Sequence, residues 1–248
     1  MKRIIFPLII MIMFISCASL PVVNSSFKEN ESVKSTYRFD VENNIAYKVE
    51  HNDSYLYLEL KTDDKTAIQK IFMHGLFIYV DPKGGRSKDI YFNYPLKKRP
   101  ELGAMKQIMK DGQNGQREFS VDRFLDRVPM EAIYSNNEEA EKIPVFSTSD
   151  GYMVELSALT PNILIYKLRI PLEETGNADI FSLGIMTGKV KMPSMNGRQR
   201  SGQRAGMSGG SMGGGRPSVG MQGGQDGGVD REAMMKQLSI WFQVDLNN

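Results

Sequence analysis

Cysteine and histidine are almost absent from this chain of 248 residues. The single cysteine is Cys17, and the two histidines are His51 and His74. One cysteine cannot form an internal disulfide, so the folded protein must be stabilised by its core. The sequence also lacks the HExxH metal motif, a nucleophile elbow followed by aspartate and histidine, and a glycine-rich phosphate loop. These absences give catalysis little support, and we expect a protein that is not an enzyme.

Long hydrophobic runs are missing as well, except for a short one at the N-terminus. Lys2 and Arg3 precede an apolar stretch at residues 4–15, which suits the core of a signal peptide better than a transmembrane helix. Residues 14–17 resemble a bacterial lipobox with Cys17 as the lipidated first residue of the mature chain. An ordinary cleaved signal peptide and an uncleaved anchor are the alternatives, and all three readings mean export.

These observations divide the start of the chain into two segments. We expect a lipoprotein signal peptide at residues 1–16 and a polar tether at residues 17–35. No acidic residue follows Cys17 at Ala18 or Ser19, so no retention signal is visible and the outer membrane is the expected destination. The domain would then face the periplasm or the cell surface.

Net charge is small, at +2, but its distribution is uneven. Basic residues are in excess in the leader and in the glycine-rich stretch 193–229, so the remaining body is mildly acidic. An acidic body argues against nucleic acid as a partner. The arginines beside glycine at Arg198 and Arg216 resemble RGG segments, yet export makes an RNA-binding role a weak alternative.

Period-two hydrophobic alternation is the main structural signal in the rest of the chain, and its clearest example is a hairpin at residues 75–96. Leu76, Ile78 and Val80 alternate with Phe77, Tyr79 and Asp81, and residues 90–94 alternate on the return. Pro82, Gly84 and Gly85 supply the turn between them.

Further strands are expected along the whole chain. They are at residues 37–41, 45–50, 55–60, 130–134, 152–156, 164–170, 181–185 and 238–246. Short helices are expected at residues 65–73, with Asp63 or Asp64 as the cap, and at 120–127. No βαβ alternation is present. The pattern predicts an all-β fold, an antiparallel β-sandwich of immunoglobulin or jelly-roll type with short helical excursions, in one domain covering residues 36–248.

Two stretches break the strand pattern. Residues 97–128 lose the alternation and have helical spacing at 100–110, so we expect an excursion that covers one end or face of the sheet. Residues 193–229 hold more than half of the 23 glycines and cannot bury enough apolar surface to offset their ordering entropy. We expect a disordered glycine-rich loop there, inserted between two strands.

The order of these elements resembles a known group of sandwiches. The stretches that carry the resemblance are 55–58, 75–85, 94–96, 166–172 and 181–185. They resemble the DOMON-like and family 9 carbohydrate-binding-module-like (CBM9-like) sandwiches, and most closely the exported versions common in Bacteroidetes. The resemblance spans roughly residues 37–246. It implies binding of a sugar or haem, or service as an accessory domain, without choosing among them.

A set of aromatic residues is the best candidate for function. On alternating strands Tyr55, Tyr57, Tyr79 and Trp241 point away from the core, and an outer face of rings is what a sugar-binding platform needs. Their polar partners would be Asn93, Arg86, Glu59 and Gln243. The alternative is that the excursion and the helices cover these rings and make them a second small core.

Other ligands find less support. Haem needs axial ligands such as histidine or methionine, and His74 beside Met73 and the distant His51 are poorly placed for that. Ca²⁺ is a candidate at Asp81 and Asp89 around the hairpin turn, with Asp63 and Asp64 nearby, although the spacing matches no dedicated loop. The sequence therefore favours a lipid-anchored glycan-binding protein. The alternative is an envelope structural or assembly lipoprotein that binds a protein partner, for example through the glycine-rich loop.

Overall fold

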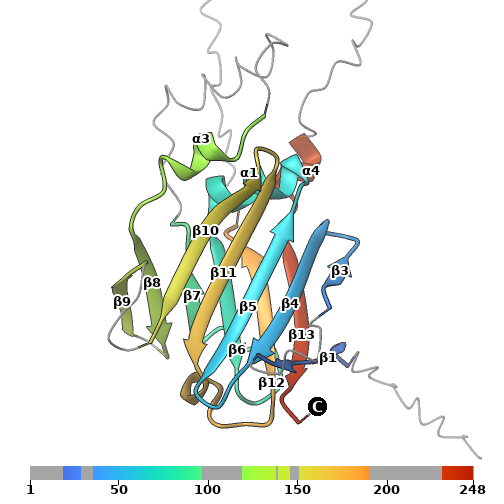
Figure 1. The fold of residues 1–248 in the computed structure, drawn as a ribbon, viewed down its shortest axis with the longest axis vertical. Helices are drawn as coiled ribbons and strands as arrows, with labels where there is room; N and C mark the ends of the chain where they lie inside the picture. Colours follow the sequence, from blue (N-terminus) through green and yellow to red (C-terminus); the bar gives the residue numbers. More distant parts are fainter. Residues whose placement is uncertain are drawn as a thin grey trace, which may run out of the picture.

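The computed structural model describes residues 19–28, 36–96, 119–137, 139–145, 151–189 and 231–247. Two β-sheets pack face to face in it (Figure 1). The seven-stranded sheet has the order β1 (Val22–Asn24), β13 (Ser239–Asp245), β12 (Ile180–Thr187), β6 (Leu76–Asp81), β7 (Ile90–Asn93), β8 (Glu131–Asn136) and β9 (Glu139–Pro144). The six-stranded sheet has the order β10 (Met153–Thr160), β11 (Ile163–Pro171), β5 (Tyr55–Thr62), β4 (Ile45–His51) and β2 (Ser26–Phe27), with β3 (Arg38–Asp40) also on β4.

The core lies between the sheets and is built by the alternation that the sequence shows. One residue in two is buried along β4, β5, β11 and β13, as with Leu58 on β5, Tyr166 on β11 and Phe242 on β13. Each such side chain removes apolar area from water, and together they stabilise the sandwich without a disulfide. The predicted all-β, largely antiparallel sandwich is confirmed.

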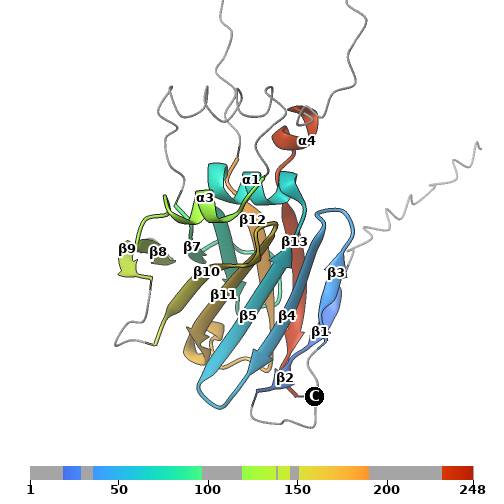
Figure 2. The same ribbon diagram turned by 45° about the horizontal axis from the view of Figure 1, so that its top comes forward.

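Helices occupy one end of this sandwich (Figure 2). They are α1 (Lys65–His74), α3 (Asp122–Leu125) and α4 (Arg231–Met235), while a 3₁₀ turn, η1 (Leu172–Thr175), follows β11. The carboxylate of Asp64 caps α1 by accepting a hydrogen bond from the Ala67 amide at 2.7 Å, and Gly75 ends the helix with φ of 77°. Asp64 is one of the two cap residues predicted from the sequence, and the helix extends one residue beyond the predicted 65–73. Among the described residues no helix has the length and apolarity needed to span a membrane.

The predicted hairpin at residues 75–96 is confirmed as β6 and β7, which pair antiparallel. Asp81 organises its turn, because its carboxylate accepts the Lys83 amide at 2.9 Å and the Ser87 amide at 2.8 Å. Gly84 takes a φ of +71°, which a residue with a side chain rarely adopts.

The segment after Ser19 differs from expectation. We predicted a polar tether up to residue 35, but residues 20–28 lie on the fold as β1 and β2; we call them the N-terminal strap. β1 pairs in parallel with β13 of one sheet, and β2 pairs in parallel with β4 of the other. Val23 is 3% exposed and joins the core. The segment is too short and too polar for its alternation to stand out in the sequence.

β9 is a further strand that was not predicted, and several other predictions fall outside the described residues, including the signal peptide at residues 1–16. β9 carries the charged sequence Glu139-Ala140-Glu141-Lys142, which hides its strand character, and it forms the outer edge of its sheet. Cys17, most of the excursion at 97–128 and the glycine-rich stretch 193–229 are not among the described residues.

Candidate ligand-binding face

Four side chains on the outer surface of the seven-stranded sheet form the best candidate site. They are Phe77 and Tyr79 on β6, Tyr91 on β7 and Trp241 on β13, and we call them the aromatic face. Strand register brings three of them into one row, because Trp241 pairs with Gly184, Gly184 with Tyr79, and Tyr79 with Tyr91. The row therefore crosses four adjacent strands.

Gly184 in the centre of β12 makes this row compact. A Cβ atom built at Gly184 would lie 2.6–2.7 Å from three atoms of the Trp241 six-membered ring. Three nearly equal distances mean that the ring face, not its edge, covers the glycine. The indole consequently lies flat on the sheet, in space that any other residue would fill.

The neighbouring rings continue this flat surface. The Tyr79 and Trp241 centroids are 6.0 Å apart with planes 14° apart, and those of Phe77 and Tyr79 are 6.0 Å apart with planes 9° apart. Tyr91 flanks both β6 rings at 5.7–5.8 Å with tilted planes. Three nearly parallel rings, one of them flat on the strands, thus form a platform along and across the sheet.

The exposure of the aromatic face lies between the two predictions. All four rings are half-buried, so they are neither a second closed core nor freely exposed side chains. Partial burial raises the pKa of Tyr79, with a smaller contribution from Tyr91.

Lys88 from the hairpin turn places its ammonium 5.5 Å from the Tyr79 ring centroid, at the long end of a cation–π contact.

Two buried polar atoms flank the platform without hydrogen-bond partners in the part of the chain that the structure describes. They are Oδ1 of Asn93, which pairs across the strands with Phe77, and Oγ of Ser182. Ser182 pairs with Asp81 and Gln243, which follow Tyr79 and Trp241 by two residues on their strands. A buried polar atom without a partner costs about 1–3 kcal/mol, and such atoms call for an explanation in a native fold. A ligand or water at the platform would supply one.

The other polar residues predicted to bind a ligand beside Trp241 and Tyr79, Arg86 and Gln243, lie in the hairpin turn or contact it. Arg86 is exposed in the turn between β6 and β7. Gln243, two residues after Trp241, donates from Nε2 to the carbonyl of Gly84 at 3.0 Å and so joins β13 to the hairpin turn.

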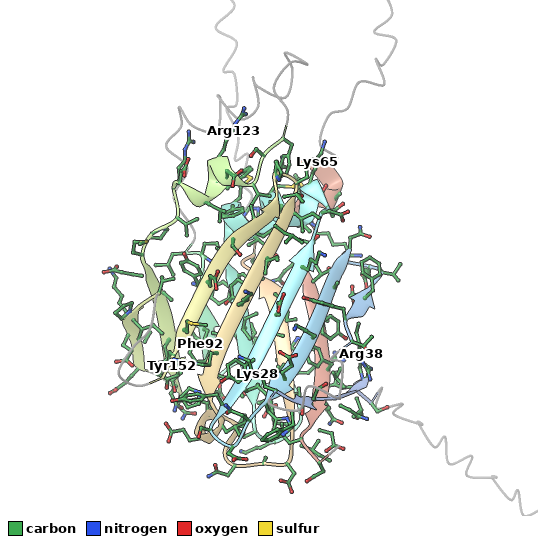
Figure 3. All side chains as sticks on the ribbon, in the orientation of Figure 1. Lys28, Arg38, Lys65, Phe92, Arg123 and Tyr152 are labelled. Carbon is green, nitrogen blue, oxygen red and sulfur yellow. The ribbon has the colours of Figure 1, made fainter. Side chains whose placement is uncertain are left out.

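Tyr55 and Tyr57 do not join the platform, and the expectation of a single four-ring set is corrected here. Both are on β5, so they face outward from the opposite sheet. Lys28 lies 3.3 Å from the Tyr57 ring centroid and Arg169 lies 4.8 Å from that of Tyr55. These cations occupy a face of each ring, and Figure 3 shows Lys28 over that sheet. Alternation shows that a residue points outward but not from which sheet.

Glu59 belongs to this second surface as well. Its carboxylate is 3.3 Å from the Lys48 ammonium and accepts a hydrogen bond from the Tyr37 hydroxyl at 2.6 Å. Glu155 and Lys167 continue the row of alternating charges, with 3.9 Å between their charged atoms. The outer surface of the six-stranded sheet is thus a charge ladder, in contrast to the aromatic face.

The residues considered for haem and Ca²⁺ have other surroundings. His51 ends β4 and lies next to the strap, whereas His74 ends α1 at the other end of the sandwich (Figure 1). Asp81 uses both carboxylate oxygens within its own turn. Within the described ranges no group of three or more His, Cys, Asp or Glu side chains is placed to hold a metal ion.

The sequence could have revealed more of this face than we took from it. Gly184 stands alone inside an apolar strand, which is a sign of close approach by another group. Ser182 gives no such sign, because its burial depends on the neighbouring strands.

Comparison with known proteins yields one distant similarity. No family model matches the chain, and no curated protein matches it. A solved family 9 carbohydrate-binding module from Caldicellulosiruptor kristjanssonii, in complex with glucose, matches with a TM-score of 0.32 and 13% identity. The match covers 67% of this chain and 77% of that one, and it is a module of the type that the sequence resemblance names. Because the similarity is low, the function of this chain must be inferred from its own side chains.

Proposed function

We propose that this protein is an exported, lipid-anchored, non-catalytic glycan-binding protein and that the aromatic face binds the sugar. The observation that carries the proposal is the flat arrangement of Phe77, Tyr79 and Trp241. The C–H faces of a pyranose are apolar and pack on aromatic rings, while hydroxyls need hydrogen-bonding groups beside those rings.

Each residue has a definite role in this proposal. Trp241 and Tyr79 stack on sugar rings, and Phe77 extends the platform along β6. Asn93, opposite Phe77, is a buried group with unused hydrogen-bonding capacity, and the exposed Arg86 would reach from the turn to ligand hydroxyls. The rings are half-buried and pack against one another, so little side-chain entropy would be lost on binding.

The anchoring part rests on the N-terminal sequence. Lys2 and Arg3, the apolar stretch 4–15 and Cys17 have the order of a lipoprotein signal peptide. Acylation of Cys17 would hold the domain at a membrane, with the outer membrane as the proposed destination.

A glycan array and a polysaccharide pull-down test the binding role. The soluble chain beginning at Ser19 is compared with Trp241→Ala, Tyr79→Ala and Tyr57→Ala. We expect Trp241→Ala and Tyr79→Ala each to weaken binding at least about tenfold, since central aromatic contacts often contribute about 2 kcal/mol or more. Tyr57→Ala is the matched control, because it removes an outward tyrosine from the opposite sheet and should leave binding unchanged.

Melting temperatures must accompany these measurements. Loss of binding in a variant that keeps its melting temperature supports the proposed site. Loss of binding in Tyr57→Ala alone would place the ligand on the other sheet. Failure of the wild-type chain to bind any glycan would refute the glycan-binding role and favour a protein partner in the envelope.

A further inference from the structure

The strap leaves very little chain between the fold and Cys17. Backbone hydrogen bonds join the Gln243 amide to the Pro21 carbonyl at 2.9 Å, and the Ser25 amide to the Asp245 carbonyl at 3.0 Å. Leu20 is 9% exposed and Ser25 is 2% exposed. Three residues separate Cys17 from the sheet edge, a span of about 10 Å at full extension.

The attachment point is close to Trp241. β1 and β13 run parallel with Val22 opposite Gln243, so continuing this register by two residues sets Leu20 level with Trp241. Leu20 is buried but is not part of the core cluster between the sheets. Its place along the strand is on the same side as Val22, opposite to the inward Val23. An anchor on Cys17 would consequently begin beside the aromatic face.

Exposed apolar side chains gather along the same border of the molecule. Val22 is 46% exposed on β1, and Ile180 is 49% exposed on the outer side of β12, where it pairs with Asp245. Phe39 on β3 is also exposed, but it pairs with Ala46 and so points outward from the six-stranded sheet, away from the aromatic face. β1, β2 and β3 lie together at one side of the sandwich (Figure 2), and we call the part of this border next to the aromatic face, with Val22 and Ile180, the strap edge.

The opposite part of the surface has a different chemistry. The charge ladder on the six-stranded sheet presents Lys48, Glu59, Glu155 and Lys167, which favour water. Trp and Tyr side chains combine an apolar ring with one polar group. They therefore favour the boundary between water and lipid headgroups. Both the short connection and the distribution of side chains therefore point to one orientation.

We infer that, when Cys17 carries the lipid, the strap edge lies against the surface of the membrane and holds the Trp241 end of the aromatic face at that surface. The inference rests on the proposed anchoring, and it replaces the flexible tether by a rigid attachment. It also narrows the ligand class, because a glycan that reaches the platform is then one displayed at the same membrane surface.

Trp241 is the only tryptophan and reports its own position. The acylated full-length mature protein is reconstituted in phosphatidylcholine/phosphatidylglycerol vesicles with and without brominated lipids, which quench nearby tryptophan fluorescence. We expect quenching of Trp241. Inserting a Gly/Ser linker of about 20 residues between Ser19 and Leu20 adds on the order of 25 Å of reach and should abolish the quenching.

Two relocated probes test the orientation. In a Trp241→Phe background, Val22→Trp puts the tryptophan on the strap edge beside β13 and Ile165→Trp puts it on the outer surface of the six-stranded sheet. We expect quenching for Val22→Trp and none for Ile165→Trp. Equal quenching of both, or none for Trp241 in the acylated protein, overturns the inference.

Mass spectrometry of Cys17 separates this inference from the anchoring proposal. Acylated protein without quenching refutes the orientation alone, whereas protein without acyl groups refutes the anchor and the orientation with it. Glycan binding by the soluble chain from Ser19 is measured independently of both.

Discussion

At the scale of single residues, Gly184 determines how the rings of the candidate site are arranged. Gly184 has no side chain, and the Trp241 indole occupies the space that a Cβ atom would need. The flat ring is therefore a consequence of Gly184, on the strand between Trp241 and Tyr79, and not of Trp241 alone. Sequence alternation predicted Trp241 and Tyr79 as outward residues, but it could not predict that Gly184 would lie between them, because pairing partners are set by the assembled sheet.

Gly184→Ala should displace the indole and destabilise the protein. Overpacking of this kind costs about 1–3 kcal/mol. Chemical denaturation of Gly184→Ala, Trp241→Ala and the double variant measures the effect as a double-mutant cycle. We expect the alanine penalty to shrink strongly once the indole is gone. A penalty of equal size in both backgrounds would show that the glycine serves the backbone and not the ring.

Glu174 is a second residue whose surroundings decide its behaviour. It is 9% exposed in η1, and its two carboxylate oxygens accept hydrogen bonds from the hydroxyls of Tyr134, at 2.5 Å, and Tyr152. Phe92 packs on both tyrosine rings, with centroids at 4.9 Å and 5.3 Å, and Figure 3 shows it close to Tyr152. Burial and the bonds to Glu174 raise the pKa of both tyrosines.

This cluster predicts loss of stability in alkali. A tyrosine with a raised pKa in the folded state keeps its proton when the unfolded chain has lost it, so its stabilising effect is complete below pH about 10 and declines above it. Each such tyrosine contributes a slope of about 1.4 kcal/mol per pH unit in the free energy of unfolding. Tyr152→Phe should reduce the slope by that amount in urea titrations above pH 10. An unchanged slope would mean that Tyr152 ionises in the folded protein.

The strap shows the limit of sequence reading at the scale of elements. Long strands such as β5 and β11 were predicted because three and four apolar residues, respectively, repeat at period two in them. β1 and β2 have three and two residues, and only Val23 points into the core, so no repeat exists to be read. Parallel pairing with β13 and β4 is a long-range event that local patterns do not encode.

We expect the strap to lose stability in acid because of His51. Its Nδ1 is 2.9 Å from Ser25 Oγ, and because that hydroxyl donates to the Asp245 carbonyl, Nδ1 acts as the donor. The Phe27 ring meets the imidazole edge to face at 5.3 Å. Burial lowers the pKa of His51, and Asp53 opposes the shift. The neutral form is thus favoured in the folded protein, and the corresponding stability is lost as the pH falls below about 6.5.

Hydrogen exchange measured at pH 7 and pH 5 checks this expectation. After correction for intrinsic rates, amides of the strap such as Ser25 and Lys28 should lose protection at pH 5, while those of β5 and β11 should not. His51→Gln removes the titration and should make strap protection independent of pH. Equal loss of protection in the variant would assign the acid effect to another group.

The whole molecule divides its chemistry between two outer surfaces. One sheet carries the aromatic face and the other carries the charge ladder, although outward residues of both look alike in the sequence. The fold class, most strands and the residues of the platform were accessible from alternation and turn signals. The separation of Tyr55 and Tyr57 from Trp241 was not, because it depends on the order of the strands in space.

This division predicts how glycan binding responds to salt. Ring stacking and neutral hydrogen bonds do not depend on ionic strength, whereas attraction to Arg86 or Lys88 is screened as the Debye length falls from about 30 Å at 0.01 M salt to about 3 Å at 1 M. If the platform provides the affinity, we expect the Kd of a bound glycan to change by no more than about twofold between these salt concentrations. In that case Arg86→Ala should also change the Kd little. Titration calorimetry at both salt concentrations, on wild type and Arg86→Ala, makes the measurement. Affinity that falls steeply with salt, and falls again in Arg86→Ala, would instead assign recognition of an anionic glycan to the hairpin turn, with the rings serving only to position the sugar.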